Sequence, residues 1–214
     1  MIFTKIYKSF LYCCYWHLKT MKIGILTTSY PRYKGDNRGI FIYNLVRTLR
    51  KNKILVDIIT VKGYESLTSD AGILPNLAKS WKARFLFIPY ILKFYFKIMK
   101  EAKICDILHC NWALTAFLAI LSKPFHKKKI ILTERSSFLI STNNFFLRPF
   151  LFFTYKNVDK LIVISKNSRN ILLKKYNLNS TVVMNGLYKP KINATKGAIR
   201  KSIEIKPNEK ALIY

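Results

Sequence analysis

Polar residues that could bind or transfer a charged group stand at or just after the ends of several short apolar segments. In chain order they are Gly35, Asp36, Arg38, Gly39, His109, Asn111, Glu134, Arg135, Ser136 and Ser165. Arg38 and Arg135 supply positive charge, and amide groups near Gly39 could approach a phosphate at the start of a helix. Such a set of residues favours a site that binds an anionic group such as a phosphate.

Each of these residues also has a structural explanation that the sequence leaves open. The two glycines could serve an ordinary tight turn, because glycine tolerates backbone conformations that other residues avoid. His109 ends an apolar segment and could be a hydrogen-bonded histidine of the core. Glu134 and Arg135 could form a surface ion pair, which contributes little to stability.

The elements that would position these residues begin with a strand, a turn, a helix and a second strand. We expect the strands over 22–28 and 54–61, because both are apolar runs without strict alternation, as in parallel strands covered on both faces. Apolar residues recur with helical spacing from Ile40, and Asp36 or Asn37 is available to cap that helix. The pattern predicts one βαβ unit.

The alternation of strand and helix continues to residue 186. We predict further strands over 106–110, 129–133, 160–164 and 181–184, helices over 82–100, 112–122, 145–156 and 166–176, a cap at Ser165, and a polar loop over 63–80. The fold class is therefore α/β, a single Rossmann-like, doubly wound parallel sheet. The carboxyl ends of its strands would bring the polar residues to one cleft.

The glycine spacing argues against a nicotinamide dehydrogenase. Gly35 and Gly39 are separated by three residues, which is not the dinucleotide fingerprint G-x-G-x-x-G. The second predicted strand also lacks the acidic residue that would bind a ribose at its end.

We expect three parts in the chain of 214 residues. Residues 1–20 are an N-terminal extension, either upstream of a true start at Met21 or a basic, aromatic segment at a membrane interface. Residues 21–186 form the Rossmann-like domain. Residues 187–214 are a linker that ends in Ala211–Tyr214, the first strand of a further domain.

The composition is strongly basic, with 38 Lys and Arg against 10 Asp and Glu and a net charge of +28. This imbalance favours anionic partners, although a general bias toward lysine on the surface explains it equally well. Nucleic acid is not an expected partner, because no helix-turn-helix, zinc-finger or RNA-binding signature is present. The four cysteines have neither metal-site nor disulfide-framework spacing, so we expect a reducing, cytoplasmic compartment and no bound metal.

Residues 82–100 raise the question of a membrane surface. The segment is apolar and aromatic, but Pro89, Lys93 and Lys97 interrupt it, so it is not a transmembrane helix. It either packs as a helix of the domain or also lies against the inner face of a membrane.

Five motifs in order resemble the N-terminal domain of family 4 glycosyltransferases of the GT-B fold. The segment from Thr28 to Phe41 is similar to TSYPR, GD and G-x-F. Residues 106–114 resemble D-h-h-H-A-H-W-A-L, residues 131–137 resemble a segment with T-E-H-S, residues 158–165 resemble A-D-x-h-h-x-h-S, and residues 182–186 resemble the hinge signature h-h-P-N-G.

The resemblance implies sugar transfer from a nucleotide-sugar to a glycan or lipid-linked acceptor in surface polysaccharide or glycoconjugate synthesis. It implies an N-terminal domain that holds the acceptor and a C-terminal domain that holds the donor, with retention of configuration and no cofactor or essential metal. Asn185 and Gly186 would be the hinge. His109, Glu134 and Arg135 would be catalytic, and Gly35, Asp36, Arg38, Gly39, Asn111, Ser136 and Ser165 would bind acceptor or phosphate.

Two positions depart from the family pattern. The second histidine of the H-x-H-W segment is Asn111, and the histidine of T-E-H-S is Arg135. On this reading the chain is one half of a glycosyltransferase, inactive without a donor-binding half on a further domain or a separate chain. The alternatives are a non-catalytic, basic module that binds membrane surfaces, or the product of a decayed gene.

Overall fold

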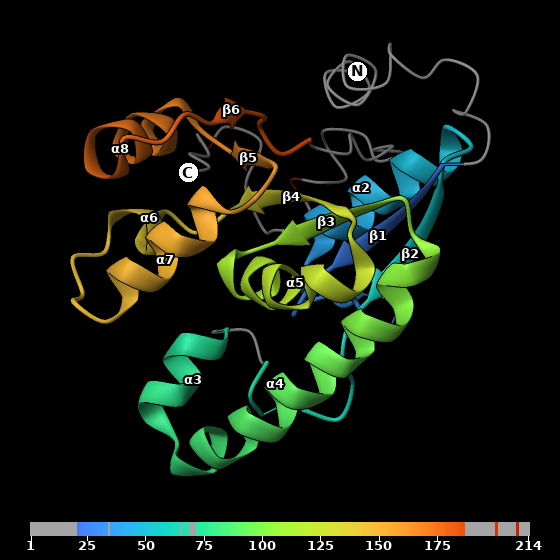
Figure 1. The fold of residues 1–214 in the computed structure, drawn as a ribbon, viewed down its shortest axis with the longest axis horizontal. Helices are drawn as coiled ribbons and strands as arrows, with labels where there is room; N and C mark the ends of the chain where they lie inside the picture. Colours follow the sequence, from blue (N-terminus) through green and yellow to red (C-terminus); the bar gives the residue numbers. More distant parts are fainter. Residues whose placement is uncertain are drawn as a thin grey trace.

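The computed structural model describes residues 21–33, 35–64, 66–68 and 72–186, together with positions 200 and 209. The predictions made for residues 1–20 and 187–214 therefore lie outside the described residues, apart from those two positions. The described chain folds around one sheet of six strands, with helices on both of its faces (Figure 1).

All strand pairs of the sheet are parallel, in the spatial order β2-β1-β3-β4-β5-β6. The strands are β1 Lys22–Leu26, β2 Leu55–Ile59, β3 Ile107–Asn111, β4 Lys129–Glu134, β5 Lys160–Val163 and β6 Thr181–Val182. The predicted α/β class and doubly wound, Rossmann-like sheet are confirmed. The order reverses at β1 and β3, which makes the gap between their carboxyl ends the expected ligand position.

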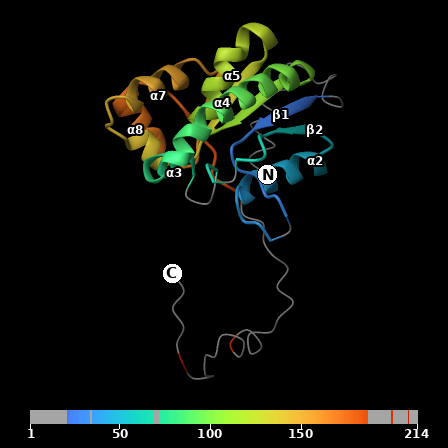
Figure 2. The same cartoon turned by 90° about the horizontal axis from the view of Figure 1, so that it is seen from below.

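The helices divide between the two faces of the sheet (Figure 2). They are α2 Ile40–Lys51, α3 Ile73–Lys79, α4 Trp81–Glu101, α5 Ala113–His126, α6 Ser137–Ser141, α7 Leu147–Lys156 and α8 Lys166–Tyr176, with a short 3-10 turn η2 at Ala102–Ile104. Helix α2 covers one face by packing Ile42 and Val46 against Ile23 and Ile25 of β1. The other face is covered by α4, α5, α7 and α8, which enclose the larger core.

The main differences from the predicted elements lie in loops. The predicted polar loop over 63–80 contains helix α3, because Pro75 is tolerated in the first turn of a helix and Gly72 adopts φ 84° just before it. Helix α6 was not predicted, and α5 runs four residues past Ser122. The prediction that Ser165 caps α8 is confirmed, since its hydroxyl accepts a hydrogen bond from the N–H of Ser168.

Candidate functional site

The loop after β1 is held in place by the carboxylate of Asp36. This carboxylate accepts hydrogen bonds from the main-chain N–H groups of Arg32 and Arg38, each at 3.0 Å, and forms an ion pair with the Arg38 guanidinium at 2.9 Å. The hydrogen bonds from Arg38 hold the pKa of the Asp36 carboxyl well below its usual range. Asp36 is therefore ionised, and its carboxylate fixes the conformation of the loop through these contacts.

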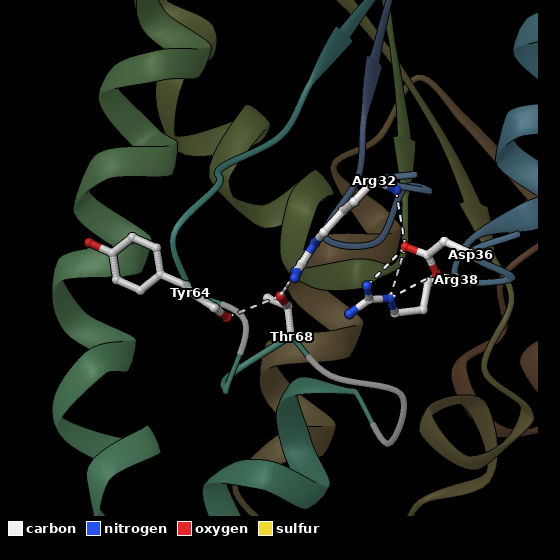
Figure 3. A network of polar contacts seen from close by, with 5 residues as sticks. All are labelled: Arg32, Asp36, Arg38, Tyr64 and Thr68. Carbon is white, nitrogen blue, oxygen red and sulfur yellow. Dashed lines mark hydrogen bonds and ion pairs between the residues drawn. The ribbon is translucent and has the colours of Figure 1, made fainter. Parts of the chain in front are cut away.

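The same network ties this loop to the segment before α3 (Figure 3). The Arg32 guanidinium donates to the Thr68 hydroxyl at 3.1 Å, and that hydroxyl donates to the main-chain oxygen of Tyr64 at 3.1 Å. The predicted capping of α2 by Asp36 or Asn37 is wrong, because Gly39 is the N-cap and no side chain caps the helix. The Asp36 carboxylate instead binds the two arginines.

Gly39 has a steric reason to be glycine. Its φ is 61°, and a Cβ built on it would lie 2.4 Å from the main-chain oxygen of Ser29, far inside van der Waals contact. Gly35 also has a positive φ, of 95°, but nothing lies within 4 Å of where its Cβ would be. Close packing of two backbone segments explains Gly39, and the phosphate approach predicted for it stays a prediction.

His109 is fully buried in the middle of β3 rather than at its end. Its Nε2 lies 2.8 Å from the Thr133 hydroxyl of β4. Burial, with a smaller contribution from the charge of Arg135, lowers the pKa of His109 to about 3, so the ring is neutral at physiological pH. This geometry matches the alternative of a hydrogen-bonded core histidine and gives no support to the predicted catalytic role.

Glu134 is also fully buried, on the opposite face of the sheet from His109. One carboxylate oxygen accepts from the N–H of Ala113 at 3.0 Å and from the Tyr155 hydroxyl at 3.1 Å. The other accepts from the N–H groups of Arg135 and Ser136, both at 2.9 Å. Burial raises the pKa of the carboxyl, and these hydrogen bonds oppose the rise.

Glu134 does not form the surface ion pair with Arg135 that the sequence left open; its buried carboxylate instead links several elements of the fold. Its carboxylate joins the end of β4 to the first residue of α5, where the helix dipole favours a negative charge, and to α7 through Tyr155. Both oxygens are saturated with donors inside the protein. The structure therefore gives Glu134 a positioning role, and the catalytic role predicted from the sequence finds no support in its geometry.

Arg135 connects three segments at the carboxyl edge of the sheet. Its Nε donates to Asn111 Oδ1 at 3.1 Å, and its Nη1 donates to Asn185 Oδ1. The guanidinium carbon also lies 4.6 Å from the centre of the Phe41 ring in the first turn of α2, in cation–π geometry. Asn111 itself is buried and donates to the main-chain oxygen of Leu26 at 3.4 Å.

Two aromatic side chains complete this arrangement. The Phe41 ring packs edge to face on the Trp112 ring with centroids 6.1 Å apart. The sequence placed both residues in motifs but assigned them no role, and the contact itself carries no sequence signal because α2 and β3 are far apart in the chain. We call Phe41, Asn111, Trp112, Arg135 and Asn185 the arginine cluster.

The predicted site residues thus fall into separate groups. Arg135, Asn111 and Asn185 come together in the arginine cluster, whereas Asp36 and Arg38 belong to the loop network with Arg32. The hydroxyls of Ser136 and Ser165 each accept from an N–H of the helix that follows, α6 and α8 respectively. Gly186, the second predicted hinge residue, has nothing within 4 Å of where a Cβ would be. Within the described part of the chain, no cluster of three or more His, Cys, Asp or Glu side chains could hold a metal ion.

A family model for glycosyltransferase family 4 matches residues 39–187. The chain belongs to glycosyltransferase family 4. Four of the five motifs that suggested this lie wholly or largely inside the matched range, and the arginine cluster lies within it. Comparison with proteins of curated function gives no match.

Solved structures place this family 4 chain within the GT-B fold. Sucrose-phosphate synthase from Thermosynechococcus elongatus superposes with a TM-score of 0.57 at 13% identity, over 88% of this chain and 54% of its own. UGT89C1 from Arabidopsis thaliana, solved with UDP, superposes with a TM-score of 0.54 at 8% identity, over 89% of this chain and 56% of its own. The family 4 chain therefore spans about half the length of these structures.

Proposed function

We propose that this domain is the acceptor-side half of a glycosyltransferase that moves a sugar from a nucleotide-sugar to a glycan or lipid-linked acceptor. The observation that carries the proposal is the arginine cluster, which lies at the carboxyl edge of the sheet inside the range that matches family 4. The UDP bound to UGT89C1 supports a nucleotide-sugar as the donor. The product would belong to a surface polysaccharide or another glycoconjugate.

In this proposal Arg135 provides the positive charge that the reaction needs. Departure of a nucleoside diphosphate concentrates negative charge, and a fixed guanidinium beside it lowers the barrier. Arg135 is partly exposed and held on three sides by Phe41, Asn111 and Asn185, so it needs little reorganisation. His109 and Glu134 have supporting roles: His109 contacts Thr133 of β4 from the middle of β3, and Glu134 fixes the end of β4.

The donor would be held mainly by a second domain, on a further part of the protein or on a separate chain. The extent of the similarity supports this division, since the chain spans about half of the GT-B structures that it resembles. Asn185 would couple the two halves, because it follows β6 and is bound by Arg135. Retention of configuration and independence of metal ions stay expectations from the family.

Amide hydrogen exchange with defined ligands tests the acceptor-side assignment. The probes are UDP, UDP-glucose and an alkyl-diphosphate-linked N-acetylglucosamine. We expect the acceptor probe to protect residues 111–113 and 133–137, and UDP-glucose alone to protect the chain weakly. Arg135→Ala should weaken this protection, because the acceptor probe carries a diphosphate that the guanidinium would also attract, while Arg169→Ala, which removes an exposed arginine from α8, should preserve it. Strong protection by UDP-glucose alone would assign the domain to the donor side.

A further inference from the structure

Helix α4 carries a continuous row of apolar side chains on the face that points away from the sheet. The row consists of Trp81, Phe85, Ile88, Leu92 and Phe96, which are 65%, 74%, 66%, 51% and 63% exposed. Their spacing of three or four residues places them on one stripe of the helix. The opposite stripe of α4 contributes Ala83, Tyr90, Phe94 and Ile98 to the core. We call the five exposed residues the α4 row.

An exposed stripe of this composition is unusual for a helix surrounded by water. Helix α8 shows the ordinary pattern, because its outward positions are almost all polar: Lys166, Asn167, Arg169, Asn170 and Lys174, with Leu173 the apolar exception. Contiguous apolar surface that remains exposed in a folded domain marks a binding surface. We therefore expect the α4 row to bind a partner, which we call its occupant.

The charges beside the row indicate what that occupant is. Lys82, Lys93 and Lys100 are exposed on α4, and the helix carries one acidic residue, Glu101, which pairs with Lys97 at 3.6 Å. The Lys82 ammonium lies 5.9 Å from the Trp81 ring centre at the start of the helix. An apolar aromatic stripe flanked by lysines is the pattern of a helix that lies in a lipid interface.

Two other occupants fit less well. A second copy docked through the same row would place the lysines of one copy against those of the other, which costs electrostatic energy. A donor half joined after β6 would meet the carboxyl ends of the strands. Helix α4 instead lies on the face of the sheet opposite α2 (Figure 2), and the α4 row is on its exposed side. Among the described helices none is long and apolar enough to cross a membrane.

We propose that the α4 row and its flanking lysines dock the domain on the surface of an anionic lipid bilayer, with the row inserted at the headgroup boundary. This contact does not depend on the proposed sugar transfer. It would bring the domain to the surface where lipid-linked molecules are found.

Vesicle flotation with the full chain tests the proposal. The chain should float with vesicles that contain phosphatidylglycerol, float much less with phosphatidylcholine alone, and dissociate as salt is raised. Phe85→Ser combined with Ile88→Ser should weaken binding about tenfold or more, because two large apolar side chains no longer insert. Leu173→Ser, the same kind of change on α8, should leave binding unchanged.

The contribution of the flanking lysines and the insertion of the α4 row into the bilayer are measured separately. Lys82→Gln with Lys93→Gln should weaken binding to the anionic vesicles, whereas Lys166→Gln with Lys174→Gln on α8 should have a smaller effect. Quenching of tryptophan emission by brominated lipids should disappear in Trp81→Phe. The proposal is overturned if the folded double serine variant binds vesicles as the wild type does. It is also overturned if light scattering shows that the wild type is a dimer and the double serine variant a monomer, while neither protein binds vesicles.

Discussion

The Nε of Arg135 donates a hydrogen bond to Oδ1 of Asn111 at 3.1 Å. These are the two residues that replace histidines of the family motifs. Asn111 is the last residue of β3, and Arg135 directly follows the neighbouring strand β4. The two departures are therefore in contact, and an amide oxygen at 111 is a suitable acceptor for the guanidinium at 135. This pair also holds Arg135 in reach of Asn185, which joins the strand edge to the chain beyond β6.

The contact predicts energetic coupling between the two residues. In a double-mutant cycle with Asn111→Ala and Arg135→Ala, the coupling free energy of unfolding should be about 1 kcal/mol, as for a partly exposed hydrogen bond to a charged group. Urea denaturation measures it. Arg135→Ala paired with Asn157→Ala, whose amide binds Phe153 within α7, should be additive. Additivity at the 111–135 pair would show that the contact does not stabilise the fold.

Glu134→Gln should destabilise the domain by about 2–3 kcal/mol, because the new amide nitrogen would face hydrogen-bond donors in a buried site. Chemical denaturation at neutral pH measures the loss. The same substitution at the partly exposed Glu101 provides the control and should change the free energy of unfolding by less than about 0.5 kcal/mol. Equal effects at the two positions would contradict the anchoring role of Glu134.

Substitution by alanine at the two glycines of the loop after β1, Gly35 and Gly39, should destabilise the domain to different extents. Gly39→Ala should cost about 3 kcal/mol or more, because the added Cβ meets the main-chain oxygen of Ser29 and φ is positive. Gly35→Ala should cost about 1 kcal/mol, from backbone strain alone. Thermal denaturation compares the two. A larger loss for Gly35→Ala would contradict the packing described for Gly39.

Buried His109 predicts a loss of stability in acid. Burial lowers the pKa of His109 to about 3 in the folded chain, from its ordinary value of about 6.5, so below pH 6.5 the unfolded chain takes up a proton that the folded chain does not. Stability should therefore fall as pH drops from 6.5 toward 3, by at most about 1.4 kcal/mol per pH unit, with no effect above pH 7.

His109→Gln isolates this contribution, because glutamine keeps a hydrogen-bonding group but cannot be protonated. The stability gap between wild type and variant should narrow progressively as pH falls below 6.5, whatever other groups titrate, since those are common to both. His126→Gln provides a comparison, because burial also lowers the pKa of His126. Parallel stability curves for wild type and His109→Gln would show that His109 is not held neutral.

Local sequence patterns predicted the strands and most helices, since parallel strands are continuous apolar runs and Ser165 caps the helix that it precedes. They failed where the role of a polar side chain depends on hydrogen-bond partners that local patterns do not reveal. Asp36 looked like a cap, but two arginines bind its carboxylate, and Glu134 reaches Ala113 and Tyr155, each 21 residues away. Spacing alone cannot reveal that a polar residue at a strand end is buried.

Transfer of labelled glucose from UDP-glucose to the alkyl-diphosphate-linked N-acetylglucosamine tests the central claim most directly. The assay compares the chain alone with the chain supplied with the donor domain of a family 4 enzyme. We predict no product from the chain alone, and product with the donor domain that Arg135→Ala abolishes and Arg169→Ala preserves. Product formed by the chain alone, at a rate that Arg135→Ala leaves unchanged, would contradict both the half-enzyme assignment and the role of the arginine cluster.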